Sequence, residues 1–343
     1  MRMQFTVGMG RNERIDEIGS HAKVAEDSGF SHMTLVDQQN LSRDIYVMMG
    51  MAAINTRRIK IGQGVTQPYT YHPSVIANGT ATINELSGGR AFLGIGAGGN
   101  ALRSMGQDMG KMAVFRESVE FIKKYMSGKE AEYQGSTMHS EWVKTPVPIY
   151  MASAGARSLQ LSGELGDGVI FFGAHPILIK WNLEQIEKGA SRVGRDPSKI
   201  DTWLRTLVYV ADNKEAARRE CASYAGSIAR HMYWYLQSNR PEVAELGERL
   251  ETAEPGLIDE FKKVYEAWDE YEHEKTDAGH AGAVTQRIID FCHLTGTPED
   301  ICERIAMVGE MGVKTISTTT FTIIDKKEMM QKIGNQIMPH FRN

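Results

Sequence analysis

The sequence predicts an α/β protein, a (β/α)8 barrel of the TIM-barrel architecture with a helical insertion between its seventh and eighth strands. Short apolar runs alternate with helical patterns from residue 4 onward. The length of 343 residues and the hydrophobic content of 41% suit one barrel domain with an insertion. The alternation stops between about residues 213 and 290, where helical periodicity continues without a strand. We therefore expect a single domain over residues 1–343, with residues 213–290 as a helical insertion or lid.

The predicted strands are short, and a helical pattern follows each of them. Apolar or small residues on both faces of a strand are typical of a buried parallel sheet. Two helix starts are also visible: Pro73 suits a first helical turn, and Thr297 followed by Pro298 suits an N-cap and a first turn. In chain order, the strands comprise residues 4–8, 32–36, 58–66, 91–95, 146–153, 168–173, 202–210 and 313–319.

Composition and charge narrow the class of protein. The formal net charge is −4 and charged residues make up 24% of the chain, which indicates neither a nucleic-acid nor a membrane partner. No apolar run approaches the roughly 18 residues of a membrane span, and the N-terminus shows no signal-peptide pattern, so we expect a cytoplasmic protein. The three cysteines, Cys221, Cys292 and Cys302, lack metal-ligand spacing, so no metal site is expected.

The chemistry of such a barrel lies at the carboxyl ends of its strands. After the third strand come Gly64, Val65 and Thr66, where the glycine removes a side chain and permits close approach to the backbone. After the second strand come Asp37 and Gln38, which could orient a substrate or a ring nitrogen through hydrogen bonds. The alternative for Asp37 is a cap of the following helix.

Two further loops suit a cofactor. The stretch Gly96, Ala97 and Gly98 follows the fourth strand; it lacks the acidic residue of a dinucleotide motif but suits a loop against a planar ligand. The loop after the fifth strand leads into a helix, whose free amides and positive end could hold a phosphate group, or it is only a capped helix start. Its residues are Ser153, Ala154, Gly155, Ala156 and Arg157, and Gly173 follows the sixth strand.

Aromatic residues near this face are candidates for substrate contacts. Tyr69 follows the third strand, and Tyr233, Trp234 and Tyr235 lie in the helical insertion, where plain core packing is the alternative. His72 precedes Pro73, and a phosphate partner, a substrate contact and a residue that starts the helix remain equal alternatives for it. No nucleophile with a base and no paired carboxylates stand out, which favours an enzyme whose cofactor carries the chemistry.

Two long runs carry a family resemblance. They are NTRRIKIGQGVTQPYTYHPSVIANGTATINELSGGRAFLGIGAGGNALRSMG and PVPIYMASAGARSLQLSGELGDGVI. They resemble the luciferase-like superfamily of flavin-dependent oxidoreductases, especially the branch of methylenetetrahydromethanopterin reductase, which uses the deazaflavin F420. The resemblance extends nearly from end to end of the chain.

The resemblance implies a cofactor site with assigned residues. A non-prolyl cis peptide is expected at Gly64-Val65, with Val65 behind the flavin or deazaflavin ring and Thr66 near its edge. The cofactor phosphate is expected at residues 153–157 with Gly173, and residues 96–98 are expected to line the cofactor.

The chain also departs from that branch at two places. Gln38 stands where the branch commonly has a histidine after the aspartate that Asp37 matches. Thr6, Val7 and Gly8 stand where a glutamate is common. The substrate of the reductase branch is therefore not directly transferable to this chain, although hydride transfer remains compatible with it.

The leading hypothesis is an oxidoreductase that transfers a hydride between F420, or FMN, and a small organic substrate. One alternative is a two-component monooxygenase that uses FMNH2 and O2 on an organic or heteroaromatic substrate, with the reduced cofactor supplied by a separate flavin or F420 reductase. A second alternative is a flavin-binding protein without catalytic activity. The resemblance also implies a homodimer. The sequence does not identify the substrate.

Overall fold

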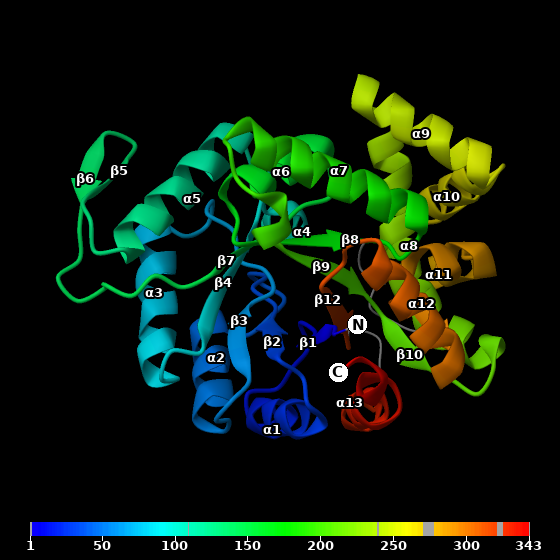
Figure 1. Ribbon diagram of the computed structural model, residues 1–343, viewed down its shortest axis with the longest axis horizontal. Helices are drawn as coiled ribbons and strands as arrows, with labels where there is room; N and C mark the ends of the chain where they lie inside the picture. Colours follow the sequence, from blue (N-terminus) through cyan, green and yellow to red (C-terminus); the bar gives the residue numbers. More distant parts are fainter. Residues whose placement is uncertain (1, 109, 239, 270–277, 321–324, 343) are drawn as a thin grey trace.

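A closed barrel of eight parallel strands forms the centre of the molecule (Figure 1). The computed structural model describes residues 2–108, 110–238, 240–269, 278–320 and 325–342. Around the barrel the strands follow the order β1-β12-β9-β8-β7-β4-β3-β2, which confirms the predicted (β/α)8 class. The strands are β1 (Gln4–Gly8), β2 (His32–Leu35), β3 (Lys60–Gln63), β4 (Ala91–Gly96), β7 (Ile149–Ala152), β8 (Gly168–Phe172), β9 (Asp201–Thr206) and β12 (Thr315–Thr319).

Helices surround the barrel on its outer face (Figure 1). Pro73 and Pro298 each occupy the first turn of a helix, as predicted, and the Thr297 side chain accepts a hydrogen bond from the amide of Asp300. The chain ends meet, since the amide of Met3 donates to the carbonyl of Phe341. The outer helices are α1 (Ile18–Ser28), α2 (Ile45–Ile54), α3 (Pro73–Leu86), α5 (Met112–Met126), α6 (Ala156–Leu165), α7 (Pro176–Arg192), α12 (Pro298–Glu310) and α13 (Lys326–Lys332), followed by short turns η3 (Ile333–Ile337) and η4 (Met338–Phe341).

Smaller elements decorate the loops. A short helix α4 (Gly99–Arg103) follows β4 at the barrel mouth, and a hairpin of β5 (Ala131–Tyr133) and β6 (Ser136–Met138) projects beside α5 (Figure 1). A turn of 3-10 helix, η1 (Pro197–Lys199), precedes β9.

Helices fill most of the chain between β9 and β12. They are α8 (Lys214–Leu236), α9 (Pro241–Ala253), α10 (Leu257–Glu266), the turn η2 (Gly279–Ala283) and α11 (Gln286–Cys292). Residues 270–277 of the predicted insertion lie outside the described residues. In Figure 1, α9 and α10 project away from the barrel on the side of α7 and α8.

The prediction of one strand over residues 202–210 is wrong in detail. Leu207 separates β9 from a second short strand, β10 (Val208–Val210), which leaves the barrel and pairs with β11 (Leu294–Gly296). The amide of Leu207 donates to Nδ1 of the buried His293, so the backbone turns away from the barrel there. A three-residue strand such as β11 carries too little periodicity to be recognised in a sequence.

Aromatic rings fill the barrel interior. The rings of His32, Phe92 and Tyr150 surround Trp203 with centroid separations of 4.9, 5.6 and 4.2 Å, respectively. Gly62 faces this cluster, and a side chain there would collide with the Phe92 ring. The interior is therefore a packed core, and the space for a ligand lies above it at the carboxyl ends of the strands.

Candidate functional site

The backbone after β3 forms the centre of the candidate site. The Gly64-Val65 peptide bond is cis, as the family resemblance implied. The amide of Gly64 donates to the carbonyl of Leu35 in β2. Beyond the cis bond, the amide of Thr66 donates to the carbonyl of Gly94 at 3.0 Å, and the amide of Gly96 donates back to the carbonyl of Thr66 at 2.9 Å. Thr66 therefore stays tied to β4, and Val65 packs against the aromatic cluster of the barrel interior.

Glycines in β4 make room for the Val65 side chain. A Cβ atom at Gly96 would lie 3.0 Å from Val65 Cγ2, and one at Gly94 would lie 3.4 Å from Val65 Cγ1. Val65 and Ala152 are half-buried and pack on the aromatic core beneath them. The result is a smooth apolar floor at the barrel mouth, with no side chain projecting from either glycine. Such a floor fits the face of a flat ring.

A buried carboxylate lies beside this floor. Thr66 Oγ1 donates to Asp37 Oδ2 at 2.5 Å, and Gln39 Nε2 donates to Asp37 Oδ1 at 2.8 Å. Asp37 is only 4% exposed, and burial raises its pKa from 3.8 to about 6, although the two hydrogen bonds oppose the rise. The structure thus brings together the predicted Asp37 and Thr66, with a carboxyl group that can exchange a proton near neutral pH. Helix α2 is capped by Asp44 instead, so Asp37 does not serve as its cap.

Two glutamines that sequence reasoning did not assign complete the network. Gln39 also approaches Tyr71, with 3.3 Å between Nε2 and the phenol oxygen. Its Oε1 accepts from Gln67 Nε2 at 3.3 Å, and Gln67 Oε1 accepts from the amide of Tyr69 at 2.7 Å. These side chains join the loops after β2 and β3 into one unit. Both glutamines follow the end of a predicted strand, and this position could have marked them as site residues. A glutamine side chain by itself, however, does not indicate a particular chemistry.

Gln38, predicted to orient a substrate or a ring nitrogen, lies next to Asp37 and is half-buried. Its backbone amide donates to Ser42 Oγ at 3.0 Å, and its carbonyl accepts from the same hydroxyl. These bonds fix the loop after β2.

The predicted phosphate loop lies at the start of α6. Three of its amides have partners within the chain: those of Ser153, Gly155 and Ala156 donate to the Ile170 carbonyl, Ser158 Oγ and the Tyr235 hydroxyl, at 2.9, 3.2 and 2.9 Å. Ala154 is half-buried and the Arg157 side chain is exposed. Because a hydroxyl that accepts can also donate, Tyr235 presents an O–H group at this loop. Tyr235 thus links the loop to α8, a contact that the sequence did not reveal.

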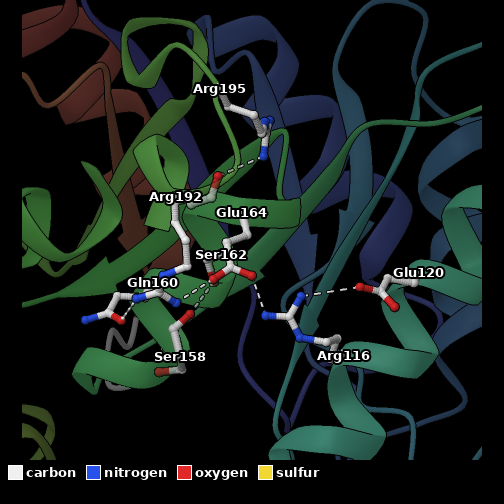
Figure 2. Close-up of polar contacts among 9 residues, drawn as sticks. Arg116, Glu120, Ser158, Gln160, Ser162, Glu164, Arg192 and Arg195 are labelled. Atoms are coloured by element: carbon white, nitrogen blue, oxygen red, sulfur yellow. Dashed lines mark hydrogen bonds and ion pairs between the residues drawn. The ribbon is translucent and has the colours of Figure 1, made fainter. Parts of the chain in front are cut away.

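A charged cluster holds α6 in place (Figure 2). The carboxylate of Glu164, whose side chain is 4% exposed, contacts the guanidinium groups of Arg116 in α5 and Arg192 in α7. The Arg192 contact is 2.8 Å long. Ser162 Oγ, on the same helix, bonds to Ser153 Oγ at 2.7 Å. Helices α5 and α7 therefore hold α6 from two sides, and α6 in turn positions the loop before it.

The residues predicted to contact the substrate lie in different surroundings. Tyr69 donates its hydroxyl to the Lys111 carbonyl at 3.1 Å, and its ring packs near Gly98, which has a positive φ of 96°. Tyr233 faces Tyr265 with ring centroids 5.2 Å apart, and Trp234 is 53% exposed. Among the predicted cofactor residues, Ala97 is half-buried, and Gly173 also has a positive φ, of 90°.

His72 lies outside the network around Asp37. Its Nδ1 accepts from the amide of Ser74 at 3.1 Å, so it caps α3, and its ring contacts Phe121 and Tyr133 edge-on. The structure thus shows the contact expected for one of the three alternatives, a residue that starts helix α3. The other two alternatives, a phosphate partner and a substrate contact, stay predictions, and the His72 side chain is exposed.

Other classes of site receive no support in the part of the chain that the structure describes. Within it, no group of three His, Cys, Asp or Glu residues is arranged to hold a metal ion. No helix among the described residues has the length and apolar character needed to cross a membrane.

Comparisons with known proteins agree with this geometry. The chain is 32% identical over 347 residues to 5,10-methylenetetrahydromethanopterin reductase of Archaeoglobus fulgidus, covering 99% of this chain and 100% of the relative. The solved coenzyme F420-dependent tetrahydromethanopterin reductase of Methanopyrus kandleri shares the fold with a TM-score of 0.78 at 24% identity, covering 99% of this chain and 100% of that one. A solved F420-dependent secondary alcohol dehydrogenase, in complex with an F420-acetone adduct, has a TM-score of 0.75 at 20% identity, with both chains fully covered. The model of the luciferase-like monooxygenase family matches residues 2–315, so the chain belongs to that family.

Proposed function

We propose that this chain is an F420-dependent oxidoreductase that transfers a hydride between the deazaflavin and a small organic substrate. The observation that carries the proposal is the apolar floor of Val65 over the β4 glycines, with the buried pair of Asp37 and Thr66 at its edge. F420 supplies the hydride chemistry when bound. The full-length relative from Archaeoglobus fulgidus and an F420-dependent hydroxymycolic acid dehydrogenase of Mycobacterium tuberculosis, 30% identical over 224 residues, support the choice of this cofactor over FMN.

The residues divide the work of binding. Val65 supports one face of the ring, and the loop of residues 153–157, with the Tyr235 hydroxyl, holds the phosphate. Asp37 can hold a proton at its buried carboxyl group, where Thr66 and Gln39 fix its orientation. Helix α8 forms part of the lid over the substrate, and its Tyr235 lies directly on the phosphate loop.

Cofactor titration tests this proposal. The purified protein is titrated with F420 and with FMN, and the reduced forms are then offered with organic substrates in the presence and absence of oxygen. Tight F420 binding and turnover that is independent of oxygen are expected. Oxidation of FMNH2 coupled to a substrate would instead favour a two-component monooxygenase that depends on a separate reductase. Binding of neither cofactor would contradict the proposal.

The assembly is proposed to be a homodimer, in line with the family resemblance. Exposed apolar side chains lie along α2 and α3, where Val47 and Ile54 are 55% and 57% exposed and Leu86 is 52% exposed. Burial of these side chains between two copies would remove apolar surface from water. Light scattering of the wild type and of Ile54→Glu tests the assignment; a wild-type monomer would contradict it.

A further inference from the structure

The side chains of Gln67 and Gln39 form a chain of hydrogen bonds that ends on Asp37. Gln67 lies after β3 and is 1% exposed, and Gln39 lies after β2 and is half-buried. Gln67 contacts Gln39, and Gln39 in turn contacts Asp37. The oxygen and the NH2 group of a glutamine are alike in shape, so the direction of such a chain follows from its bonding partners.

Two backbone amides determine how the Gln67 side chain is turned. The amides of Tyr69 and Thr70 donate to Gln67 Oε1 at 2.7 and 3.1 Å. Because a backbone amide can only donate, the oxygen of Gln67 must face them, and its NH2 group must face away. There, Nε2 donates to the Thr70 hydroxyl and, at 3.3 Å, to Gln39 Oε1. Both hydrogens of this NH2 group therefore have acceptors.

The orientation of Gln39 follows from that of Gln67. The NH2 group of Gln67 faces Gln39, so an oxygen must meet it; a Gln39 side chain turned the other way would place two NH2 groups against each other. Gln39 Nε2 then donates to Asp37 Oδ1 at 2.8 Å and to the Tyr71 hydroxyl at 3.3 Å. Asp37 Oδ1 therefore accepts a hydrogen bond whether the carboxyl group is ionised or protonated.

The second oxygen of this carboxyl group faces Thr66. Thr66 is fully buried, and its Oγ1 lies 2.5 Å from Asp37 Oδ2. A hydroxyl group can donate or accept, whereas the NH2 group of Gln39 can only donate. A proton on Oδ1 would confront the N–H of Gln39, while a proton on Oδ2 finds an acceptor in the Thr66 hydroxyl. The two oxygens of the carboxyl group are therefore not equivalent.

We infer that Gln67 and Gln39 are positioning residues that hold the acidic hydrogen of Asp37 on Oδ2, the oxygen beside Thr66. Neither glutamine has to touch a ligand for this role, because Gln67 acts through Gln39 and Gln39 acts through Asp37. Thr66 directly follows Val65, so the hydrogen is kept on the side of the apolar floor. The inference rests on the proposed function, because that floor is where the F420 ring is proposed to lie.

Charged and titratable groups around Asp37 influence how readily it takes up this hydrogen. They include Asp44, which caps α2, Tyr46 in α2 and Tyr71 after β3. Burial nevertheless has the largest effect and raises the pKa of Asp37 to about 6. At about pH 5 most molecules therefore carry the hydrogen, and its position can be measured in the folded protein without a cofactor.

Infrared spectroscopy of the carboxyl C=O stretch, on the full-length protein without cofactor at about pH 5, tests the inference. The Asp37 band is identified as the one that Asp37→Asn removes. Gln39→Met takes away the donor to the C=O oxygen, so it is expected to shift the band to higher frequency and to lower the acid dissociation constant of Asp37 about tenfold. Thr66→Val leaves that C=O group bonded to Gln39 and is expected to shift the band less.

Gln67→Glu tests the direction of the chain at nearly constant side-chain volume. The introduced carboxylate can still accept from the two backbone amides, but it cannot donate to Gln39. Gln39 is then expected to turn over and offer its oxygen to Asp37, so that the acidic hydrogen moves to Oδ1. In this background Thr66→Val is expected to shift the band more than Gln39→Met does. The added negative charge by itself would not exchange the order of the two shifts.

Gln286→Met is the matched control, because Gln286 Nε2 donates to Asp290 Oδ1 at 3.0 Å in an exposed pair on α11. It is expected to leave the Asp37 band in place. The comparison of Thr66→Val in the two backgrounds does not use Gln39→Met, so it decides the question even where that variant does not fold.

Three results would overturn the inference. They are a band that stays in place in Gln39→Met, a larger shift in Thr66→Val than in Gln39→Met when Gln67 is present, and an order of shifts that Gln67→Glu leaves unchanged. Failure of F420 to bind would contradict the proposed function, and the infrared measurement would still locate the hydrogen.

Discussion

At the scale of single residues, Asp37 combines burial with a fixed pair of donors. Its side chain is nearly inaccessible, and its pKa is raised from 3.8 to about 6 because burial disfavours the charged form. An acid whose pKa is higher in the folded state binds its proton more tightly there. The contribution of Asp37 to stability is therefore fully present below pH 3.8 and is lost as the pH rises through about 6.

Replacement by asparagine tests this linkage. Asp37→Asn removes the titration, so the free energy of unfolding of the variant is expected to increase relative to the wild type as the pH rises from about 3 to about 8. The expected change in the difference is on the order of 2–3 kcal/mol. Urea denaturation of both proteins across this range measures it. Parallel pH profiles for the two proteins would show that Asp37 titrates alike in the folded and unfolded chains.

At the scale of elements, the glycines of β4 control the position of Val65. Gly96→Ala places a methyl group 3.0 Å from Val65 Cγ2, so Val65 must shift by a few tenths of an ångström or rise into the mouth. We expect a loss of about 1–2 kcal/mol in stability from this crowding, and about tenfold weaker F420 binding. Calorimetry and fluorescence titration measure the two effects.

Gly282→Ala is the matched control for that change, because a Cβ atom there meets nothing within 4 Å. Its F420 affinity is expected to equal that of the wild type. If Gly96→Ala also bound F420 as tightly as the wild type, the floor under Val65 would not be the surface on which the ring rests.

Helix α6 offers a second test at this scale. Glu164 accepts from two arginines on neighbouring helices while its own side chain is 4% exposed, whereas Glu120 is 51% exposed and pairs with Arg116 at 3.3 Å (Figure 2). Glu164→Gln is expected to cost about 1–3 kcal/mol, less than a fully buried pair because both arginines are partly exposed. Glu120→Gln is expected to change stability by no more than about 0.5 kcal/mol. Urea denaturation compares the two; equal losses would contradict a special role for Glu164.

At the scale of the whole molecule, the barrel was predictable because it depends on periodic patterns. Alternating strands and helices, together with helix starts at Pro73 and Pro298, follow from local sequence. The family resemblance correctly indicated the cis bond at Gly64-Val65.

Contacts between distant segments were not predictable in this way. Tyr235 and Ala156 are 79 residues apart, and the guanidinium of Arg205 reaches Gly8 from a distant part of the chain. His72 illustrates the reverse case, since a polar residue near a predicted site turned out to cap α3 among aromatic rings. Only the folded barrel decides which polar side chains meet at its mouth.

The bond between Tyr235 and Ala156 joins the helical region after β9 to the barrel, and it can be tested as a link across the molecule. Tyr235→Phe keeps the buried ring, which lies 6.0 Å from Trp181, and removes the acceptor for the Ala156 amide. We expect a loss of about 1 kcal/mol in stability and faster hydrogen exchange at the start of α6 and in α8.

Tyr233→Phe, two positions earlier on the same helix, is the control for this change, because the Tyr233 ring packs against Tyr265 rather than against the phosphate loop. Hydrogen exchange that rises equally in both variants would mean that α8 is held by packing alone. A rise confined to Tyr235→Phe would show that one hydroxyl couples the proposed lid to the proposed phosphate loop, so that binding at the loop would also stabilise the lid.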